Sequence, residues 1–171
     1  MSALVPAAAA PVGVPHPPPP HRVAPHAALD PWVEGVTPSL ENELFETTYK
    51  VLPRHNVLKV YVFDASGYES AGIRFSARVP HEPDDLSEAE LDHEAAELIR
   101  TTFDRFPQIQ ELDIWGTIPV ANAQATEIEN TVFSVSADRT TYERIRDDAS
   151  LNDPDFLASF GPVWVAPEVP R

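Results

Sequence analysis

The residues whose types and spacing come nearest to a catalytic motif are His93, Glu94 and Glu97, in the segment LDHEAAELIRTTF at 91–103. Their order differs in one residue from H-E-x-x-H, in which two histidines one helical turn apart bind zinc and the glutamate serves as general base. Glu97 takes the place of the second histidine. The segment is therefore either a metal site with a carboxylate ligand or the exposed face of a helix.

The pattern around this segment favours the exposed helix. Residues 86–106 predict a helix that ends before Pro107. At about 100° per residue, one of its faces collects the core-facing residues Leu91, Ala95, Leu98, Ile99, Thr102 and Phe106. His93 and Glu97 lie roughly 160–200° from the centre of that face. Zinc enzymes turn their ligands into a cleft where a third ligand waits, so we predict no metal here.

Other residues that could do chemistry form no motif. His55 and His81 each stand at a strand boundary beside prolines, where a histidine can serve as a general base but is usually a surface residue. The oxygen-rich segment 147–155 lacks the D-x-[DN]-x-[DN]-G spacing of calcium loops, and Asn152 and Asp153 are needed as helix caps. Among 27 acidic residues, close carboxylate pairs are unavoidable and identify no site. The sequence predicts no catalytic residue, no metal ligand and no cofactor.

The elements that must position these residues follow from periodicity and caps. Thr37 and Pro38 predict the N-cap and first residue of a helix, and Ser87 with Glu90 forms a capping box for helix 86–106. The remaining elements are a hairpin over 56–80, strands over 109–120 and 131–137, and helices over 138–148 and 152–161. The order α-β-β-α-β-β-α-α predicts a two-layer α+β fold, with a four-stranded, mainly antiparallel sheet and helices packed on one face.

Composition divides the chain near residue 37. Residues 1–38 hold 10 of the 19 prolines, including PHPPPPH at 15–21, with one basic and two acidic side chains. Such a segment buries too little apolar surface to offset its ordering entropy, and proline-rich chains are semi-rigid spacers. We predict a Pro/Ala/His-rich disordered tether over 1–37 and a single α+β domain over 38–171. The tether histidines are predicted to belong to a solvated linker rather than a metal-binding tail: His16, His21 and His26.

The first residues, MSALVPAAAAP, raise the question of export. They lack the charged start and the unbroken apolar core of a signal peptide, but SALVPAAAA resembles the end of one. This resemblance favours export to the periplasm or cell envelope. The alternative is a cytoplasmic protein with a disordered leader.

The overall charge limits the classes of partner. Twelve Lys and Arg residues against 27 Asp and Glu residues give a net charge of −15, which opposes binding to phosphate backbones and anionic membranes. The sequence contains no cysteine and no run of about 18 apolar residues that could span a bilayer. We therefore expect another protein, presenting a basic or apolar surface, rather than nucleic acid.

The two faces of the predicted sheet differ in composition. Alternation turns one set of residues toward the helices: Leu58, Val60, Val62, Ile73, Phe75, Ala77, Leu112, Ile114 and Ile118. The opposite face carries Lys59, Ser76, Asp113 and Thr117, together with the residues that we predict to bind a protein: Tyr61, Phe63, Arg74, Arg78 and Trp115. Aromatic and arginine side chains are enriched at interfaces. In the alternative, the C-terminal segment FLASFGPVWV folds over this face and buries Tyr61 and Trp115.

We expect a non-catalytic binding or assembly module on a proline-rich tether, for example a subunit of a bacterial cell-envelope complex. The alternative is a small carboxylate- or metal-dependent hydrolase, and a nucleic-acid binder is disfavoured by the charge. A cluster of His55 or His81 with two carboxylates in a concave pocket would favour the enzyme. An uncovered face at Tyr61 and Trp115 would favour the binding module.

Overall fold

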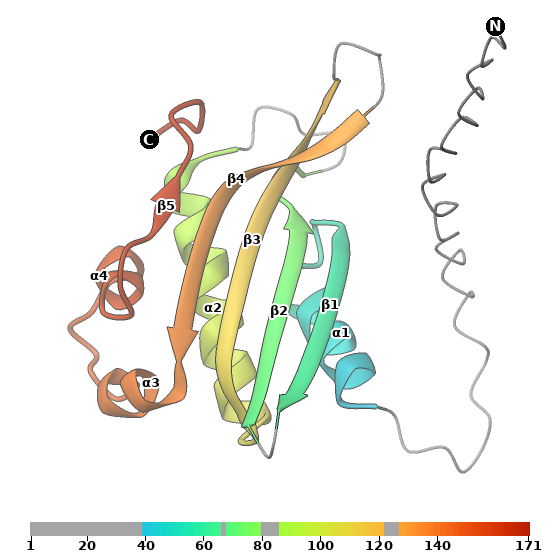
Figure 1. Cartoon of the computed structure of the whole chain (residues 1–171). Coiled ribbons are helices and arrows are strands. Elements are labelled where there is room, and N and C mark those ends of the chain that lie inside the picture. The colour runs from blue at the N-terminus through green and yellow to red at the C-terminus, as the bar shows by residue number, and fades with distance from the viewer. Residues whose placement is uncertain (1–38, 66–67, 80–85, 122–126) are drawn as a thin grey trace, which may run out of the picture. The chain divides into compact units, whose positions relative to one another are not determined.

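The computed structural model describes residues 39–65, 68–79, 86–121 and 127–171. Over these residues the chain forms one five-stranded sheet and four helices (Figure 1). The predicted tether over 1–37 and the candidate base His81 lie outside the described residues, and so do the tether histidines His16, His21 and His26.

The helices are α1 (Leu40–Val51), α2 (Glu88–Arg105), α3 (Arg139–Ile145) and α4 (Asp153–Ala158). Ser39, not Thr37, is the N-cap of α1, and its Oγ accepts a hydrogen bond from the Asn42 N–H at 3.3 Å. The prediction of Thr37 was wrong because Ser39 has the same capping chemistry and stands directly before the first helical residue. Ser87 caps α2 as predicted, accepting from the Glu90 N–H at 3.2 Å. None of the described helices is long and apolar enough to cross a bilayer.

The strands are β1 (Val57–Ala65), β2 (Tyr68–Ser76), β3 (Ile109–Ala121), β4 (Glu127–Asp138) and β5 (Trp164–Val165), and they lie side by side in that order. Neighbouring strands are antiparallel except for β2 and β3, which are parallel because α2 returns the chain to the end of the sheet where β2 began. The predicted sheet is therefore corrected from four strands to five, with one parallel pair. The two-residue β5 is too short to show alternation in the sequence.

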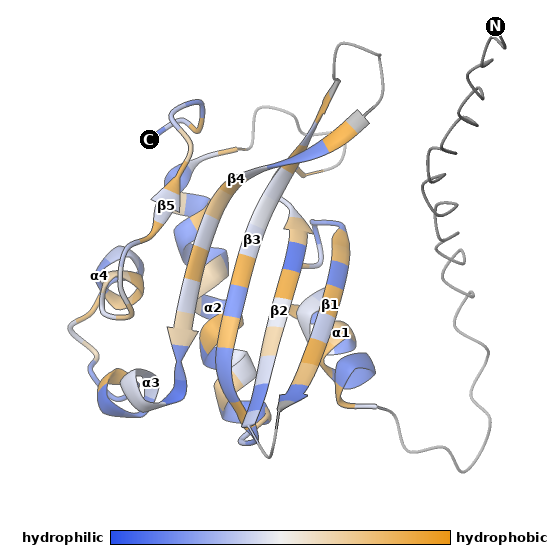
Figure 2. Ribbon diagram, viewed as in Figure 1, coloured by the Kyte–Doolittle hydropathy of each residue, from blue (hydrophilic) through white to orange (hydrophobic). Residues whose placement is uncertain are grey.

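The core lies between one face of the sheet and the helices α1 and α2, which cover that face (Figure 1). Apolar and polar residues alternate along much of the strands (Figure 2), so that every second side chain points toward the helices. Four strand residues are fully buried, as predicted: Ile73, Phe75, Leu112 and Ile114. α2 is buried over a wider arc than its predicted face, because α3 and α4 pack beside it. Phe103 of α2, for example, is 1 % exposed and its ring centroid lies 5.2 Å from that of Tyr142 in α3.

Candidate functional site

The face of the sheet that points away from α1 and α2 is the candidate binding surface, and none of the described helices lies on it (Figure 1). The register places one row of side chains across the whole sheet: Lys59, Arg74, Trp115, Ser134 and Trp164. The next row holds Tyr61, Gly72, Asp113 and Ser136. Residues paired in this way point to the same side of a sheet. We call these two rows, together with Phe63, the open face.

A stacked aromatic pair lies at the centre of the open face. The ring centroids of Tyr61 on β1 and Trp115 on β3 are 5.9 Å apart, with an interplanar angle of 29°, although β2 runs between these strands. The pair can form because Gly72 stands between them: a Cβ atom there would overlap the Tyr61 ring. The ring of Phe63 lies 5.0 Å from that of Tyr61 and extends the aromatic surface. The missing side chain at Gly72 thus lets the tyrosine ring reach across β2.

Charged groups border this aromatic pair. Lys59 Nζ lies 5.6 Å from the centroid of the Tyr61 ring, and Arg74 is exposed beside Trp115 in the first row. In the second row, Asp113 accepts a hydrogen bond from the Ser136 hydroxyl. Partial burial raises the pKa of Tyr61 and the Asp113 carboxylate raises it further, against a smaller lowering by Arg74. The open face therefore offers apolar rings with cations in one row and a carboxylate in the next.

Four of the five residues predicted to bind a protein lie on the open face. Tyr61 and Trp115 are half-buried, Arg74 is exposed, and Phe63 is 62 % exposed. Arg78 is exposed but lies two residues beyond the end of β2, outside the paired rows. Strand alternation was therefore sufficient to group these side chains where the strands are regular.

Two residues of the sheet differ in exposure from what their predicted positions imply. Leu58 was predicted in the core but is 39 % exposed, because the register between β1 and β2 shifts between Val57 and Lys59. Thr117 was predicted on the open face and is 1 % exposed there, with its hydroxyl donating a hydrogen bond to Glu129 Oε2 at 2.6 Å. The register between β3 and β4 shifts directly before it, and the extra residue, Val132, is on β4. Each shift adds a residue to one strand and interrupts the two-residue period. The period alone predicts no such shift.

Sequence reasoning missed Gly72 and Trp164 as parts of this surface. An isolated glycine inside a strand is itself a signal that another group approaches closely. Trp164 is 48 % exposed and joins the first row because β5 pairs it with Ser134. The alternative in which the C-terminal segment covers the face is incorrect for the described residues. Phe156 is buried against α2, with its ring centroid 4.2 Å from Arg100 Cζ. The strand β5 extends the sheet at its edge and does not cover the open face.

The residues on α2 that resemble the zinc motif, His93, Glu94 and Glu97, are called the near-motif here. His93 and Glu97 belong to an ion-pair network that joins α2 to α4. His93 Nδ1 lies 2.8 Å from Asp153 Oδ2, while Arg100 Nη1 lies 2.9 Å from Asp153 Oδ1 and 3.3 Å from Glu97 Oε1. Burial raises the pKa of Asp153, but the contacts with His93 and Arg100 outweigh it and lower the pKa overall. The His93 side chain is 63 % exposed. The predicted solvated face is thus partly correct, since α4 covers part of it and Asn152 caps α4 as expected.

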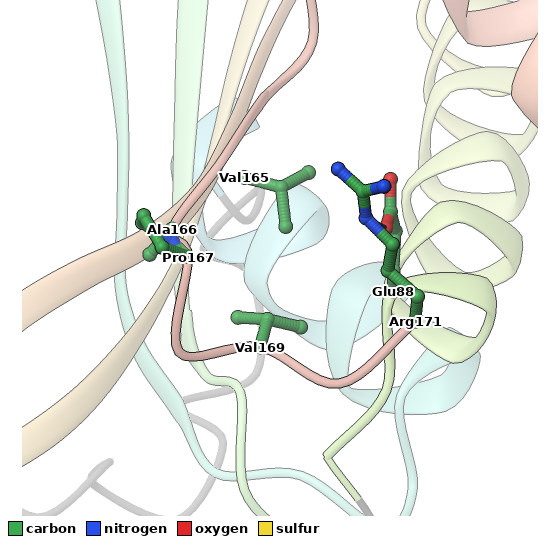
Figure 3. A pocket seen from close by; sticks show the side chains of 6 residues that line it. All are labelled: Glu88, Val165, Ala166, Pro167, Val169 and Arg171. Atoms are coloured by element: carbon green, nitrogen blue, oxygen red, sulfur yellow. Dashed lines mark ion pairs between the residues drawn. The ribbon is translucent and has the colours of Figure 1, made fainter.

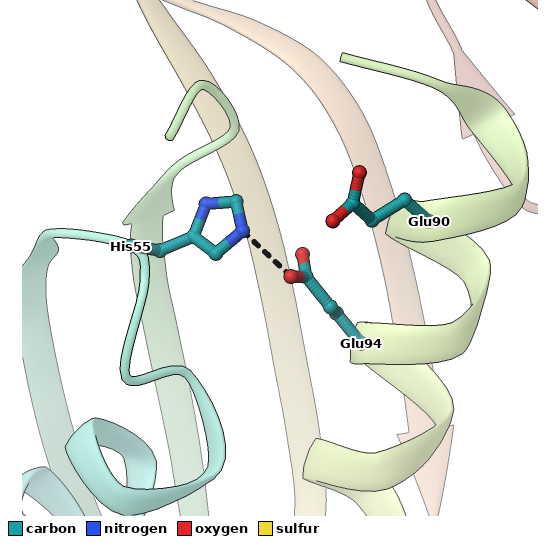
Figure 4. Close-up of side chains that lie close together, drawn as sticks. All are labelled: His55, Glu90 and Glu94. Carbon is teal, nitrogen blue, oxygen red and sulfur yellow. Dashed lines mark ion pairs between the residues drawn. The ribbon is translucent and has the colours of Figure 1, made fainter. Parts of the chain in front are cut away.

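His55 is buried, in contrast to the surface position expected for a histidine at a strand boundary. It is 3 % exposed, with Nδ1 2.6 Å from the Ser76 carbonyl oxygen and Nε2 2.6 Å from Glu94 Oε1. Burial lowers the pKa of His55, but Glu94, the Ser76 carbonyl and Glu90 together outweigh it and raise the pKa. Figure 4 shows the histidine facing both glutamates. Of the described residues, this group is the one with the composition and spacing to hold a metal ion.

A cavity near the C-terminus has fewer groups that could take part in catalysis than the His55 group has (Figure 3). Its volume is about 500 Å³, and it is lined by Glu88, Val165, Ala166, Pro167, Val169 and Arg171. The two charged lining residues pair with each other, with Arg171 Nε 3.7 Å from Glu88 Oε2. Because these residues include no histidine and no hydroxyl or thiol nucleophile, the cavity has no acid–base or nucleophilic group beyond that glutamate.

No protein-family model, no curated protein and no solved structure matches this chain significantly. The functional argument therefore rests on the geometry of the open face and of the His55 group.

Proposed function

We propose that the protein is a non-catalytic binding or assembly module that recognises a protein partner through the open face, carried on the proline-rich segment of residues 1–37. The observation that supports this proposal is the accessible stack of Tyr61 on Trp115, with Phe63 and Trp164 exposed on the same surface. Aromatic side chains gathered on an exposed surface mark interaction sites. They also dominate the energy of the interfaces that bury them.

The open face indicates the chemistry of the partner. Its rings suit an apolar anchor, which would bury surface worth about 25 cal/mol per Å². The row that contains Phe63 also contains two acidic residues, Glu111 on β3 and Asp138 on β4. These carboxylates, and the net charge of −15, favour basic side chains around that anchor. The partner that we propose is therefore a protein with an apolar or aromatic anchor flanked by basic residues.

A comparison of three immobilised proteins tests this proposal: the full chain, Trp115→Ala and the control Tyr49→Ala. Tyr49 is the matched control because it is an aromatic residue that is 57 % exposed on α1, away from the open face. We expect a protein from the natural source to be retained by the full chain and by the control, and lost with Trp115→Ala. With the purified partner, the Kd should be at least about tenfold weaker for Trp115→Ala, as for an interface anchor. An equal Kd for all three proteins would contradict the proposal.

One observation supports the second candidate, a small carboxylate- or metal-dependent hydrolase. His55 lies beside Glu90 and Glu94, and a buried histidine with carboxylates is a common arrangement in metal and acid–base sites. The cavity of Figure 3 is not lined by any of these three residues. The cluster is therefore better supported as a metal site than as a site that binds a substrate.

A further inference from the structure

The group formed by His55, Glu90 and Glu94 joins two parts of the chain that are distant in sequence. His55 lies in the connection between α1 and β1, while Glu90 and Glu94 stand one turn apart on the same side of α2 (Figure 4). One potential ligand atom from each residue lies within 4.8 Å of the other two. The spacing of the two glutamates follows from the helix, because residues four apart are neighbours on its surface.

The histidine is held in the orientation that a metal ligand requires. A carbonyl oxygen only accepts hydrogen bonds, so the 2.6 Å contact with Ser76 O places a proton on Nδ1 and turns Nε2 toward the glutamates. The His55 side chain is 1 % exposed, and its ring packs edge-on against Phe75 at 5.5 Å. Metal-binding histidines typically donate their second ring N–H to a carbonyl or carboxylate in this way.

Polar atoms of this group are buried without hydrogen bonds. His55 Nε2 and Glu94 Oε1 are in ion-pair contact at 2.6 Å. Among the described residues, however, neither Nε2 nor the buried Glu94 Oε2 has a hydrogen-bond partner of good geometry. A buried polar atom without a partner is costly. A cation between Nε2 and the carboxylates would give Nε2 and the Glu94 carboxylate a partner.

We propose that His55 Nε2, Glu94 and Glu90 bind a divalent transition-metal ion such as zinc. The imidazole selects against calcium and magnesium, which take oxygen ligands. With zinc bonds of about 2.0–2.1 Å, the ligand atoms of a four-coordinate site lie roughly 3.3 Å apart. The Nε2–Oε1 pair, now 2.6 Å apart, would open by less than about 1 Å, and the Glu90 oxygen, now within 4.8 Å of the other two ligand atoms, would move inward by up to about 1.5 Å. Water supplies the fourth ligand.

Arg54 does not prevent this coordination. Its Nη1 lies 3.2 Å from Glu90 Oε1, and the Arg54 side chain is 50 % exposed. Contact with a guanidinium does not prevent a carboxylate from binding a metal, because its two oxygens together offer about four lone-pair sites. The ion would then neutralise two partly buried carboxylates and connect the α1–β1 turn to the first turns of α2. This site uses Glu94 of the near-motif and leaves His93 and Glu97 out.

The test is a calorimetric titration of the full chain with Zn²⁺, repeated with Co²⁺ and followed by absorption spectroscopy. We expect one equivalent to be lost in His55→Ala, and at least tenfold weaker binding of that equivalent in Glu94→Gln and Glu90→Gln. The matched control His93→Ala, on the same helix but outside the group, should bind as the parent chain does. The difference between variants decides the result, because other histidines of the chain can bind zinc independently.

Circular dichroism would establish that each variant is folded. Glu90→Gln keeps the test valid if the buried His55→Ala variant does not fold, because Glu90 is partly exposed and glutamine has the same shape. Equal zinc binding by the parent chain, Glu94→Gln and Glu90→Gln would overturn the proposal. Displacement of the ion by a 100-fold excess of Ca²⁺ would overturn its assignment to a transition metal.

Discussion

Substitution of Gly72 by alanine should disrupt the aromatic stack of the open face and leave the fold intact. An added Cβ would overlap Cζ, Oη and Cε2 of Tyr61, which are the far end of a side chain rather than backbone. The ring can therefore swing away without movement of the strand. Tyr61 would then lose its stacked position on Trp115, and the space between β1 and β3 would be closed by the new methyl group.

The expected change in stability is small, because two effects oppose each other. Loss of an aromatic pair costs about 0.5–1.5 kcal/mol beyond area burial. Replacement of a glycine inside a strand contributes roughly 0.5–1 kcal/mol in the other direction, since the unfolded chain loses conformational freedom. The free energy of unfolding of Gly72→Ala should therefore change by less than about 1 kcal/mol. Urea denaturation measures this change.

The effect of Gly72→Ala on the surroundings of Tyr61 should be larger than its effect on stability. Tyr61 would leave its partly buried position beside Asp113. Both the burial and the Asp113 carboxylate raise the pKa of Tyr61 in the parent chain. The pKa of Tyr61 should therefore fall toward its ordinary value, as measured by NMR titration, and the near-ultraviolet circular dichroism of the stacked rings should weaken. Partner binding should be lost together with these signals.

Gly116→Ala is the matched control on the core side of the sheet. A Cβ at Gly116 would lie 3.3 Å from Phe133 Cβ and 3.4 Å from Ala77 Cβ, where closely packed atoms must give way. Overpacking of this kind typically costs about 1–3 kcal/mol, and it should leave the pKa of Tyr61 unchanged. The reasoning would be refuted if Gly72→Ala lost more than about 3 kcal/mol. It would also be refuted if Gly72→Ala left the near-ultraviolet spectrum and the pKa of Tyr61 as they are in the parent chain.

The remaining predictions concern the open face, the α2–α4 contact and the proline-rich segment. Trp115→Ala should cost about 1–2 kcal/mol in urea denaturation, whereas Ile114→Ala, in the adjacent core position, should cost about 2–5 kcal/mol; equal losses would place Trp115 in the core. The pKa of Asp153 is lowered in the folded chain, so its ion pairs stabilise the fold above the unfolded value of about 3.9. This contribution is lost as the pH falls through the lowered pKa, so Asp153→Asn should unfold at the same urea concentration as the parent chain near pH 2 and at a lower one at pH 7. His93→Ala should change the free energy of unfolding by no more than about 0.5 kcal/mol, as usual for exposed ion pairs, and a loss above 2 kcal/mol would contradict this. Deletion of residues 1–36 should leave Tm unchanged in a thermal melt, because proline-rich segments make few buried contacts; a fall of more than about 5 °C would show that they pack on the domain.

Much of the fold could be predicted because its signals are local. The hairpin, α2 with its Ser87 cap, and the termination of α4 near Gly161, which has a φ of 140°, all follow from residues within a few positions of each other. The same holds for the grouping of Tyr61 and Trp115 on one face, since alternation needs only the neighbouring residues. The prediction of the start of α1 failed because two residues, Thr37 and Ser39, satisfy the same local capping rule.

The environment of His55 could not be predicted, because it depends on residues that meet only in the folded chain. The sequence shows a histidine after a proline and an arginine, which is typical of an exposed turn. Burial comes from α2, which places Glu94 39 positions later against the ring. Periodicity identifies which residues share a side of α2, but it does not identify what that side will contact.

The sequence by itself determined the four helices, the strands other than β5, most of the two faces of the sheet, the acidic character and the proline-rich segment, because each depends on composition or short-range spacing. The tertiary structure alone decided the register shifts at Leu58 and Thr117, the parallel pairing of β2 with β3, and the docking of α4 on the polar side of α2. It also decided that Tyr61 reaches Trp115 across Gly72. The physical reason is that a two-residue or 3.6-residue period fixes the direction of a side chain relative to its own element. Which element comes to lie against that side chain depends on how the whole core packs.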